Sequence, residues 1–484
     1  MRPKEKGKNL FYLLLPVLGV AFFLWYISRA GGDVVYSDYI RIIDSYLPDV
    51  TDTAKLFTPD ILTRIPATFM QRIVNVQSFR YSVMFDRVCS LFGIALMAGT
   101  AARFAIRRRI PFWAYTASMA VLFSLTKWEI LMNGTCWPHM VAIGLFFINY
   151  AVFDEIWQGE ADGMTEFIAC LMPLLWLLFA GEYIASYCVT MILISGFGVL
   201  TGGAVKVVGR KVQYVFARIL IMTVLALVLY MISRSFAEWE HAGSTEMTLI
   251  ELIRYAPSFL LRFFAKSFTG AVIGAETANV LIGGRPVPDM LLLAIGVIMI
   301  LAYAVALILY FSNGMNEVSV FPLCLLVSGA VNHAAVTCAR WIFLDENYGL
   351  SSRYAGQFMV GLIGLILIAG MYRKPKPNYR KRGNERLIRG VRCFLAGAIL
   401  LVVAGNVVTT VDEVRKAPYR KANYEHMEEV VLDYRNRSPE ELCGTLEWHK
   451  EPETLLNALK ILEENGLNVF NPTKRTAPEG GKTQ

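Results

Sequence analysis

Residues 9–28, with the sequence NLFYLLLPVLGVAFFLWYIS, contain no charged side chain and are almost entirely apolar. A run of about 20 apolar residues is long enough to cross the hydrocarbon core of a bilayer as an α-helix. It is also longer than the apolar core of about 7–15 residues that is typical of a signal peptide. We therefore expect a first membrane span that stays in the protein, although Ser28 and Ala30 would fit a weak cleavage site.

Apolar runs of this kind recur along the whole chain. The sequence has 484 residues, 55% of them hydrophobic, and a mean hydropathy of +0.45. The runs are continuously apolar and do not alternate with polar residues, which favours helices over a transmembrane β-barrel. The sequence therefore predicts an all-α polytopic membrane protein with about eleven transmembrane helices. The candidate spans are residues 9–28, 82–104, 110–125, 135–153, 164–181, 183–205, 213–232, 289–311, 318–341, 354–372 and 391–411.

Two of these spans are barely separated. Residues 164–205 form one long apolar stretch that is interrupted only at Gly181, Glu182 and Tyr183. If this interruption is not a turn between two helices, the chain has one span fewer.

Charge, cysteine content and motifs exclude several classes of protein. The net charge of +8 does not indicate nucleic-acid binding, because much of it lies in short loops between spans. The eight cysteines have no metal-ligand spacing, and most lie within apolar runs, where we expect them to pack as small side chains. The motifs GxxxxGK[ST], HExxH and GxSxG are absent, as is a GxGxxG before a helix. An ATP-driven pump or a hydrolase of those kinds is therefore not supported, and we expect no nucleic-acid partner.

The positions of Lys and Arg predict the orientation in the membrane. With eleven spans, four basic stretches fall on one side, and the positive-inside rule makes that side cytoplasmic. They are residues 2–8, 103–109 and 206–211 and the loop RKPKPNYRKRGNERLIRGVR at residues 373–392. Loops near Asp154 and Asn316 lie on the same side without this excess. We predict a cell-membrane protein with a cytoplasmic N-terminus and an extracytoplasmic C-terminus.

The longer polar segments then lie outside the membrane. They are loops at about residues 29–81, 233–288 and 343–352, and a tail at 412–484 that follows a transmembrane domain at 1–411. The tail contains ETLLNALKILEENG, a pattern that predicts a helix ending at Gly466. The leucines on one face of this helix are Leu455, Leu456, Leu459 and Leu462. We expect a small external helical region there.

The first outer loop contains a short amphipathic segment, YSDYIRIIDSYLPD, at residues 36–49. On a helix of about 100° per residue, its apolar side chains gather on one face and its polar side chains on the other. The apolar face consists of Tyr36, Ile40, Ile43 and Leu47, and the polar face of Asp38, Arg41 and Ser45. We expect this helix to lie in the membrane interface, with its apolar face against lipid or against the spans, and to end at Pro48.

The second outer loop contains a similar segment, ELIRYAPSFLLRFFAKSF, at residues 251–268. We expect an amphipathic helix that is kinked at Pro257. Its polar stripe consists of Glu251, Arg254, Ser258, Arg262 and Lys266. Helices that lie flat on the bilayer suit an enzyme whose lipid substrate reacts at the level of the headgroups, whereas channels do not need them.

The order of a first span, an acidic outer loop with interfacial helices, many further spans and an external C-terminal part resembles the type C glycosyltransferase superfamily. The matching motif is Asp38, Tyr39 and Arg41, which look like the Asp-Tyr-x-Arg pattern in the first outer loop of bacterial members. The resemblance implies a membrane enzyme that takes a sugar from a polyprenyl-phosphate carrier. It also implies Asp38 as the general base, and we expect Arg41 or Lys127 to be an accessory charge. The paired adjacent acids of several branches are not found in this loop.

Other assignments for this loop remain open. Asp33 and Asp44 are further candidates for the general base. Asp38 could instead be a helix-capping carboxylate beside Ser37.

A second polar group lies in LTKWEILMNGTCWPHM, residues 125–140, at the outer ends of two spans. Charged residues at such positions are costly unless they are paired or functional. We take Glu129 as a catalytic candidate, and Lys127, Trp128 and His139 as candidates for substrate binding. Trp128 could be a platform for a sugar ring, although an aromatic anchor at the membrane interface is its more usual role.

Two more candidate groups lie at the outer ends of spans. Glu182 separates two apolar runs, and it either solvates a tight turn or contributes to a site. Arg340, Arg353 and Tyr354 flank the outer loop at residues 343–352. An arginine there could bind a phosphate through two hydrogen bonds or reach lipid headgroups. Arg353 and Tyr354 look like the Arg-Tyr found near the lipid-phosphate site of some type C transferases.

No metal site is predicted. Glu238, Glu240 and His241 could hold a divalent cation, but no flanking residue has the spacing of a further ligand. We therefore expect no certain cofactor.

The leading hypothesis is a glycosyltransferase that moves a sugar from a polyprenyl-phosphate carrier to a surface glycan or lipid on the outer face of the membrane. A transporter or flippase of lipid-linked saccharides would need charges deep in the spans, where the sequence has chiefly Asp86 and Arg87. A polysaccharide polymerase, which is the third alternative, typically has arginine-rich outer loops. The arginines of the first outer loop are Arg41, Arg64, Arg72 and Arg80.

Overall fold

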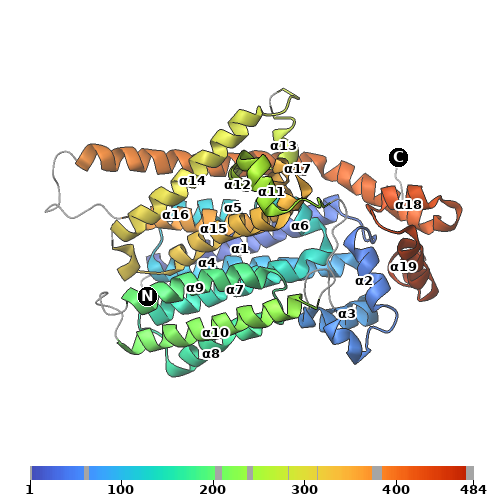
Figure 1. Ribbon diagram of the computed structural model, residues 1–484, viewed down its shortest axis with the longest axis horizontal. Helices are drawn as coiled ribbons and strands as arrows, with labels where there is room; N and C mark the ends of the chain where they lie inside the picture. Colours follow the sequence, from blue (N-terminus) through green and yellow to red (C-terminus); the bar gives the residue numbers. More distant parts are fainter. Residues whose placement is uncertain are drawn as a thin grey trace.

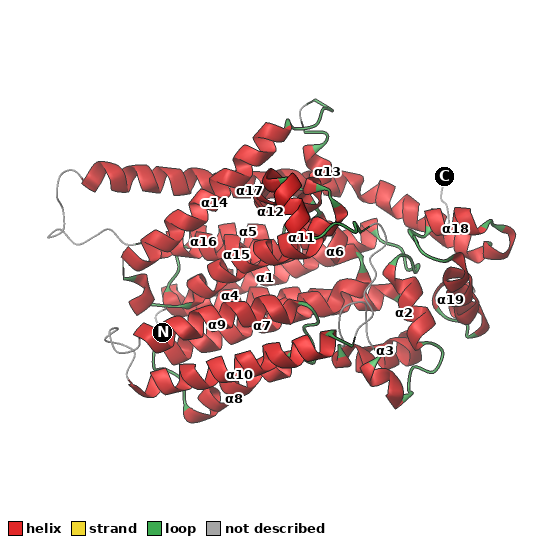
Figure 2. Cartoon of the chain, viewed as in Figure 1, coloured by secondary structure: helices red, strands yellow, loops and turns green. Residues whose placement is uncertain are grey.

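The computed structural model describes residues 3–58, 65–201, 210–236, 244–281, 283–312, 314–372 and 384–475. Within these ranges every regular element is a helix, and no β-strand is present (Figure 2). The predicted all-α fold is thus confirmed. The candidate cation ligands Glu238, Glu240 and His241, and Arg64 of the first outer loop, lie outside the described residues.

Nine helices in the described part of the chain are long and apolar enough to cross a membrane. They are α1 (Pro3–Ala30), α4 (Val83–Arg108), α7 (Trp137–Trp157), α9 (Tyr183–Thr201), α10 (Arg210–Arg234), α14 (Asp289–Ser312), α15 (Phe321–Arg340), α16 (Ser352–Met371) and α17 (Asn384–Leu432). By the length and composition of its helices, the chain is a polytopic helical membrane protein.

Two of the eleven predicted spans form helices that are too short to cross a bilayer. The run at residues 110–125 gives α5 (Phe112–Leu122), and the run at 164–181 gives α8 (Gly163–Trp176). At 1.5 Å per residue, these helices are roughly 16 and 21 Å long, against a hydrocarbon core of about 30 Å. By the length of their helices, these two runs do not qualify as spans, because each helix ends in a turn before the apolar run is complete.

The long helices lie side by side in one bundle (Figure 1). The two short helices belong to it as well, since α5 packs against α16, and α8 packs against α10 and α7. Helices α4 and α7 approach closely, because a Cβ atom on Gly93 would lie 2.3 Å from the backbone of Met140. A similar contact joins α15 and α16 at Gly329 and Gly361. Small residues thus allow these helices to pack backbone to backbone.

The first outer loop of the prediction forms α2 (Asp38–Tyr46), a 3-10 helix (Thr53–Phe57) and α3 (Pro66–Phe79). Helix α2 begins two residues later than its apolar pattern suggests, because Ser37 has a φ of 51°, which a right-handed helix cannot contain. Most apolar side chains of α2 are buried within the protein, and the helix packs against α19 (Pro452–Glu464). The predicted helix is thus present, and a helix of the C-terminal region covers it.

The second outer loop forms α11 (Leu249–Tyr255), α12 (Pro257–Val272) and α13 (Ala275–Ala278). The kink predicted at Pro257 is a complete break, since Ala256 lies between two separate helices. The second half of α12 is buried against α14, α15 and α16. This half is therefore part of the bundle and does not lie flat on its surface.

The C-terminal region continues directly from the last span. Helix α17 runs through residue 411, where the sequence predicts the end of the transmembrane domain, and has 49 residues. It is followed by α18 (Pro439–Thr445), α19 and α20 (Pro472–Arg475). The buried residues of α19 include three of the four leucines that were predicted to share a face, namely Leu455, Leu459 and Leu462.

The remaining helices are short and lie in the connections. They are α6 (Trp128–Met132) and 3-10 helices at Leu125–Lys127, Gly134–Cys136, Met315–Glu317, Trp341–Phe343, Glu346–Leu350, Tyr434–Asn436 and Asn468–Phe470.

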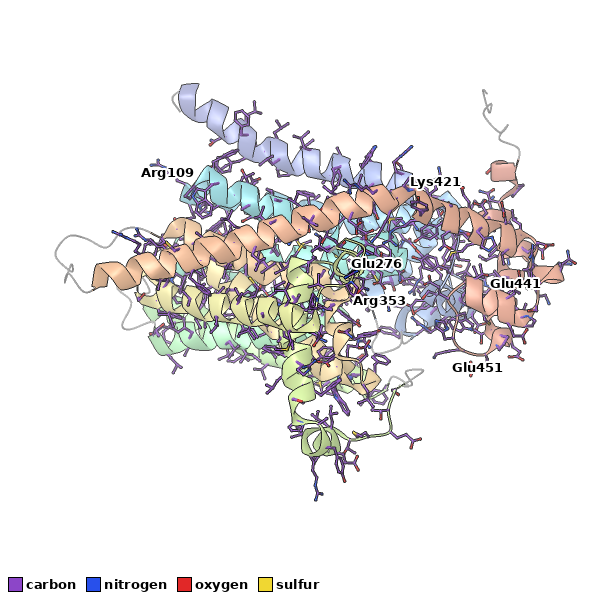
Figure 3. All side chains as sticks on the ribbon, turned by 90° about the horizontal axis from the view of Figure 1, so that it is seen from above. Arg109, Glu276, Arg353, Lys421, Glu441 and Glu451 are labelled. Carbon is purple, nitrogen blue, oxygen red and sulfur yellow. The ribbon has the colours of Figure 1, made fainter. Side chains whose placement is uncertain are left out.

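The two ends of the bundle differ in the elements that cover them. The start of α1 lies at one end, whereas α2, α3, α18 and α19 lie at the other (Figure 1). Figure 3 shows the same division, with Arg109 at one end and Glu441 and Glu451 at the other. At the Arg109 end, arginines of α4 form ion pairs with acids at the C-terminal end of α7 and in the turn after it. Part of the positive charge that predicts the cytoplasmic side is therefore neutralised within the protein. These pairs join Arg103 and Arg107 to Glu155, Arg108 to Asp154, and both Arg107 and Arg108 to Glu160.

Candidate functional site

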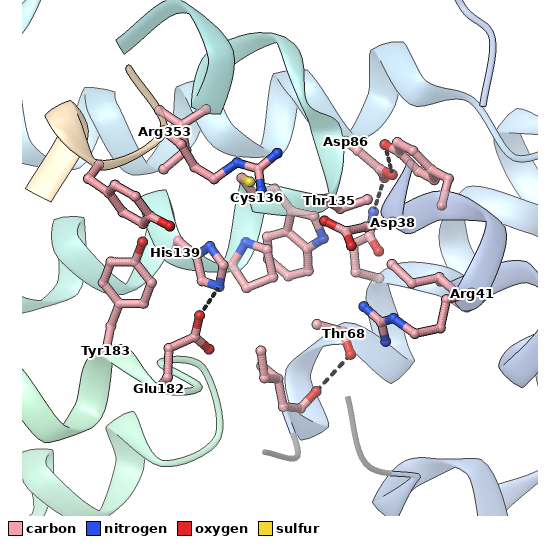
Figure 4. Close-up of a pocket in the computed structure, with 18 of the residues that line it drawn as sticks. Asp38, Arg41, Thr68, Asp86, Thr135, Cys136, His139, Glu182, Tyr183 and Arg353 are labelled. Atoms are coloured by element: carbon pink, nitrogen blue, oxygen red, sulfur yellow. Dashed lines mark hydrogen bonds and ion pairs between the residues drawn. The ribbon is translucent and has the colours of Figure 1, made fainter. Parts of the chain in front are cut away.

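The end of the bundle that carries α2 and α3 contains a cavity with a volume of about 240 Å³. Its walls come from α2, α3, the first turns of α4 and α7, the turn before α9, and the neighbouring ends of α15 and α16 (Figure 4). Seven of the ten site residues predicted from the sequence line it. They are Asp38, Arg41, His139, Glu182, Arg340, Arg353 and Tyr354. The fold therefore brings residues from distant parts of the chain into one site.

Helix α2 carries Asp38 into this cavity, and the residues on either side of Asp38 are held in place. The backbone N–H of Ser37 donates to the carbonyl of Leu446 over 2.8 Å. The hydroxyl of Tyr39 donates to the Asp86 carboxylate over 2.8 Å. Burial and the nearby Asp86 charge raise the pKa of Tyr39 well above its usual value, so the hydroxyl keeps the proton that it donates. The position of Asp38 is thus fixed by its neighbours in the chain.

The three acids of the first outer loop have different surroundings. Asp33 accepts hydrogen bonds of 2.6 and 3.1 Å from two backbone N–H groups in the first turn of α4, and so caps that helix. Asp44 accepts a hydrogen bond of 2.6 Å from the side chain of Asn457 in α19. Asp38 lines the cavity, whereas the other two do not. Ser37, the N-cap residue of α2, forms no side-chain capping bond.

Asp86 also lines the cavity, although the sequence marked it only as a charge within a span. Its carboxylate accepts hydrogen bonds from the Tyr39 hydroxyl and from the side-chain amides of Gln71 and Asn75. A carboxylate that accepts three hydrogen bonds is fixed in orientation. Asp86 therefore ties α2 and α3 to α4 and forms part of the rigid wall.

His139 and Glu182 form an ion pair at the cavity wall, with 3.4 Å between His139 Nε2 and Glu182 Oε1 (Figure 4). The His139 ring also stacks on Tyr183, with 4.5 Å between the ring centroids. Burial raises the pKa of Glu182, but the attraction of His139 and its hydrogen bond outweigh burial and lower the pKa to about 2. Glu182 follows Gly181, which has a φ of 53°, so it lies in a tight turn and at the cavity as well.

Arg353 lies in the first turn of α16, and its guanidinium points into the cavity (Figure 4). Its Nε donates to Glu129 Oε1 over 2.8 Å, and Ser352 Oγ donates to the other oxygen of Glu129 over 2.9 Å. This ion pair uses one of the five N–H donors of the guanidinium. The pair therefore orients Arg353 without consuming its capacity to bind an anion.

Arg340 and Tyr354 lie near each other in the same wall. The Arg340 guanidinium is 5.8 Å from the centroid of the Tyr354 ring, within the range of a cation–π contact. The Tyr354 ring is in turn 5.9 Å from the ring of Tyr348, which also lines the cavity. This part of the wall combines positive charge with aromatic surface.

A groove with a volume of about 520 Å³ adjoins the cavity, and Arg353 lines both. Two of the predicted site residues, Trp128 and Glu129, line the groove together with residues of α17. The guanidinium of Arg420 lies 3.2 Å from the centroid of the Trp128 ring. One face of Trp128 is therefore covered by a cation–π contact within the protein.

Lys127 lines neither the cavity nor the groove. It is fully buried, and its Nζ donates to the carbonyls of Val121 and Ser124 over 3.2 and 2.8 Å. Burial lowers the pKa of Lys127 to about 7. This lysine closes the C-terminal end of α5, and its position does not support the predicted role in substrate binding.

Three residues of α3 that the sequence did not mark as site residues also line the cavity, namely Thr68, Gln71 and Arg72. Their spacing of three and four residues places them on one face of a helix. This spacing is the signal that could have revealed them. The spacing was not used, because the candidate residues were sought at the ends of apolar spans and this segment lies in the middle of a loop.

The described ranges contain no group of three or more His, Cys, Asp or Glu side chains that could hold a metal ion. Comparisons with protein-family models, with curated proteins and with solved structures found no match to this chain. The residues and geometry of the cavity are therefore the basis on which a function can be inferred.

Proposed function

We propose that the protein is a membrane glycosyltransferase that moves a sugar from a polyprenyl-phosphate carrier to a glycan or lipid acceptor. One observation carries the proposal: Asp38 and Arg353, which are 315 residues apart in the sequence, line the same cavity. A carboxylate can take a proton from a hydroxyl group, and an arginine can bind a phosphate through two hydrogen bonds. Transfer of a sugar from a phosphate carrier is favoured by a base for the acceptor hydroxyl and by a cation that stabilises the departing phosphate. Asp38 is also the base that the resemblance to type C glycosyltransferases implies.

The roles follow from the charges that change during the reaction. As the acceptor oxygen forms a bond to the anomeric carbon of the sugar, its proton passes to Asp38. The bond between this carbon and the phosphate oxygen of the carrier breaks, and the phosphate keeps the electron pair and gains a negative charge. Arg353 stabilises that charge. Glu129 orients Arg353 through their 2.8 Å hydrogen bond and is a positioning residue in this scheme.

Other residues of the wall suit the same substrate. Arg41 and Arg340 add positive potential to the cavity and would attract an anionic donor. Tyr354 offers aromatic surface, and the His139–Glu182 pair offers polar atoms to the hydroxyl groups of a sugar.

The location of the cavity suits a substrate that is anchored in lipid. It lies where α4, α7, α9, α15 and α16 begin or end, and these are membrane-spanning helices by length and composition. The phosphate of a polyprenyl carrier sits at this level, with its chain in the bilayer. We place this end on the extracytoplasmic side of the cell membrane, with the N-terminus in the cytoplasm and the C-terminus outside, because the basic end of α4, which includes Arg109, lies at the opposite end of the bundle (Figure 3).

Sugar transfer by the purified full-length protein in lipid vesicles tests the proposal. The protein is offered a panel of polyprenyl-phosphate sugars that are radiolabelled in the sugar. Asp38→Asn keeps the size of the side chain but cannot take up the proton, so we expect transfer to fall by about 10²–10⁴-fold. Asp44→Asn is the matched control, because Asp44 lies on the same helix and outside the cavity.

Each outcome of this experiment selects among the alternatives. Unchanged transfer in Asp38→Asn would contradict its role as the base. A carrier that is bound equally by both proteins and never consumed would favour a transporter or flippase. A product that gains many sugars in one reaction would favour a polymerase, whose arginines would include Arg41 and Arg72, both of which line the cavity.

A further inference from the structure

Arg72 of α3 is the most deeply buried of the four arginines that line the cavity, with 6% of its surface exposed. Its Nη1 has no hydrogen-bond partner among the described residues. The ring of Tyr46 covers one face of the guanidinium, with 3.6 Å between the Arg72 Cζ and the ring centroid. The N–H groups of a guanidinium lie in its plane, so a ring stacked on its face does not satisfy them.

The acid on the same side of the cavity does not satisfy this arginine. The Asp86 carboxylate accepts its hydrogen bonds from Tyr39, Gln71 and Asn75. Arg72 and Asp86 attract each other through their charges, but no hydrogen bond between the two joins them among the described residues, and Nη1 of Arg72 has no acceptor there. Buried donors in proteins nearly always have an acceptor. A buried guanidinium nitrogen without one, on a side chain that lines a cavity, therefore points to a ligand that supplies the acceptor.

We propose that Arg72 binds an oxyanion, either a carboxylate or a phosphate, that is carried by the transferred sugar or by the acceptor. A guanidinium binds such groups through two parallel hydrogen bonds. The inference rests on the proposed function, in which Arg353 already binds the phosphate of the carrier. Arg72 then selects for a second negative charge in the reacting molecules.

The position of Arg72 connects it with the general base. Tyr46, which covers its guanidinium, belongs to α2, the helix that carries Asp38. Arg353 comes from α16, and Figure 4 shows the Asp38 carboxylate between the guanidinium groups of Arg353 and Arg41. Asp38 and Arg72 thus line one cavity from two helices in contact, and in this scheme the molecule that gives its proton to Asp38 lies on their side of the site.

Binding of two pairs of small molecules to the purified full-length protein tests this inference. Glucuronate is compared with glucose, which tests a carboxylate on a sugar, and glycerol phosphate is compared with glycerol, which tests a phosphate on an acceptor. Saturation-transfer NMR reports the affinity of each. The variants are Arg72→Gln and Arg72→Lys. The matched control is Arg80→Gln, since Arg80 is exposed at the C-terminal end of the same helix and outside the cavity.

We expect the wild-type protein to bind at least one anion more tightly than its neutral partner, by about tenfold or more. Arg72→Gln should abolish this preference and leave the affinity for the neutral molecule unchanged, and Arg80→Gln should behave like the wild type. Arg72→Lys keeps a buried cation but cannot form two parallel hydrogen bonds, so it should lose part of the preference even if Arg72→Gln does not fold. A preference that survives either change in full, or no preference in the wild type, would overturn the inference.

These measurements need neither carrier nor turnover, so the inference and the proposed function fail in different ways. Transfer that depends on Asp38, together with no preference for anions, would overturn the role of Arg72 alone. A preference that depends on Arg72, together with no transfer of any sugar, would overturn the glycosyltransferase and leave an anion-binding site.

Discussion

The Nε of Arg353 donates to Oε1 of Glu129 over 2.8 Å, and this ion pair lies where the cavity meets the adjoining groove. Arg353 lines both the cavity and the groove, whereas Glu129 lines only the groove. A second hydrogen bond, from Ser352 Oγ over 2.9 Å, holds the Glu129 carboxylate. The direction of the guanidinium in the cavity is therefore set by a carboxylate that stands outside it.

We expect Glu129 to act on the reaction through Arg353. Glu129→Gln removes the charge that orients the guanidinium and should lower kcat/KM for the carrier by about tenfold, because small misplacements of a catalytic group are costly. Arg353→Gln removes the donor to the phosphate and should cost about 10²–10³-fold. The double variant should be no worse than Arg353→Gln alone, since both changes remove one interaction. Steady-state kinetics of the three variants would show multiplied losses if the two residues act independently.

The pair of Glu182 and His139 should make the stability of the protein depend on acid pH. Burial acts to raise the pKa of Glu182, but His139 lowers it to about 2 from the ordinary value of 4.5. Between these values the unfolded chain binds more protons than the folded one, so the contribution of Glu182 is fully present above pH 4.5 and is lost as pH falls toward 2. Thermal unfolding of the wild type and of Glu182→Gln in detergent measures this contribution. The difference between their Tm values should shrink over that interval, and a constant difference would contradict the pairing.

The apolar runs predict the helices well because a bilayer requires long stretches of apolar side chains. Their lengths predict the ends of the helices less well. The run at 110–125 is predicted to span, yet α5 ends at Leu122, because the next residues form a turn in which Lys127 donates to the carbonyls of Val121 and Ser124. Helix α17 differs in the opposite direction, since the helix continues 21 residues beyond residue 411, where the sequence predicts the end of the last span.

The predicted site residues come together because most of them share one property, a polar side chain at the outer end of a span. Span order alone places such residues at one end of the bundle, which is why Asp38, His139 and Arg353 meet. The same property also selected Lys127, whose side chain turns into the protein. The direction of a side chain depends on tertiary packing, which a local sequence pattern does not show. The packing of α19 against α2 is a second example, because the two helices are far apart in the sequence.

Asn468 should be important for stability because it joins the C-terminal region to the start of α4. Its backbone N–H donates to the Arg80 carbonyl over 2.7 Å, and its side chain donates to the Tyr81 carbonyl over 2.8 Å. Asn468→Ala leaves the buried Tyr81 carbonyl without this donor, and we expect it to lower the free energy of unfolding by about 1–3 kcal/mol. Asn465→Ala is the control, since Asn465 is exposed. Equal Tm values for the two variants would contradict the prediction. Because Tyr81 lines the cavity, sugar transfer should fall as well in Asn468→Ala.

Gly93 should tolerate no larger side chain, because it lies where α4 and α7 touch. A Cβ atom there would meet the Met140 carbonyl at 2.3 Å, whereas a Cβ atom on Gly99 of the same helix has no heavy atom within 4 Å. Gly93→Ala should therefore lower the free energy of unfolding by about 1–3 kcal/mol through overpacking. Gly99→Ala should leave it unchanged or raise it by up to about 1 kcal/mol, since alanine favours a helix over glycine. Gly93→Ala should also affect the site. Helix α4 carries Asp86 and α7 carries His139, and both residues line the cavity, so separating the two helices should widen it. We thus expect Gly93→Ala to lose both thermal stability and transfer, and a Gly93→Ala protein with the Tm and activity of Gly99→Ala would show that the two helices do not depend on this contact.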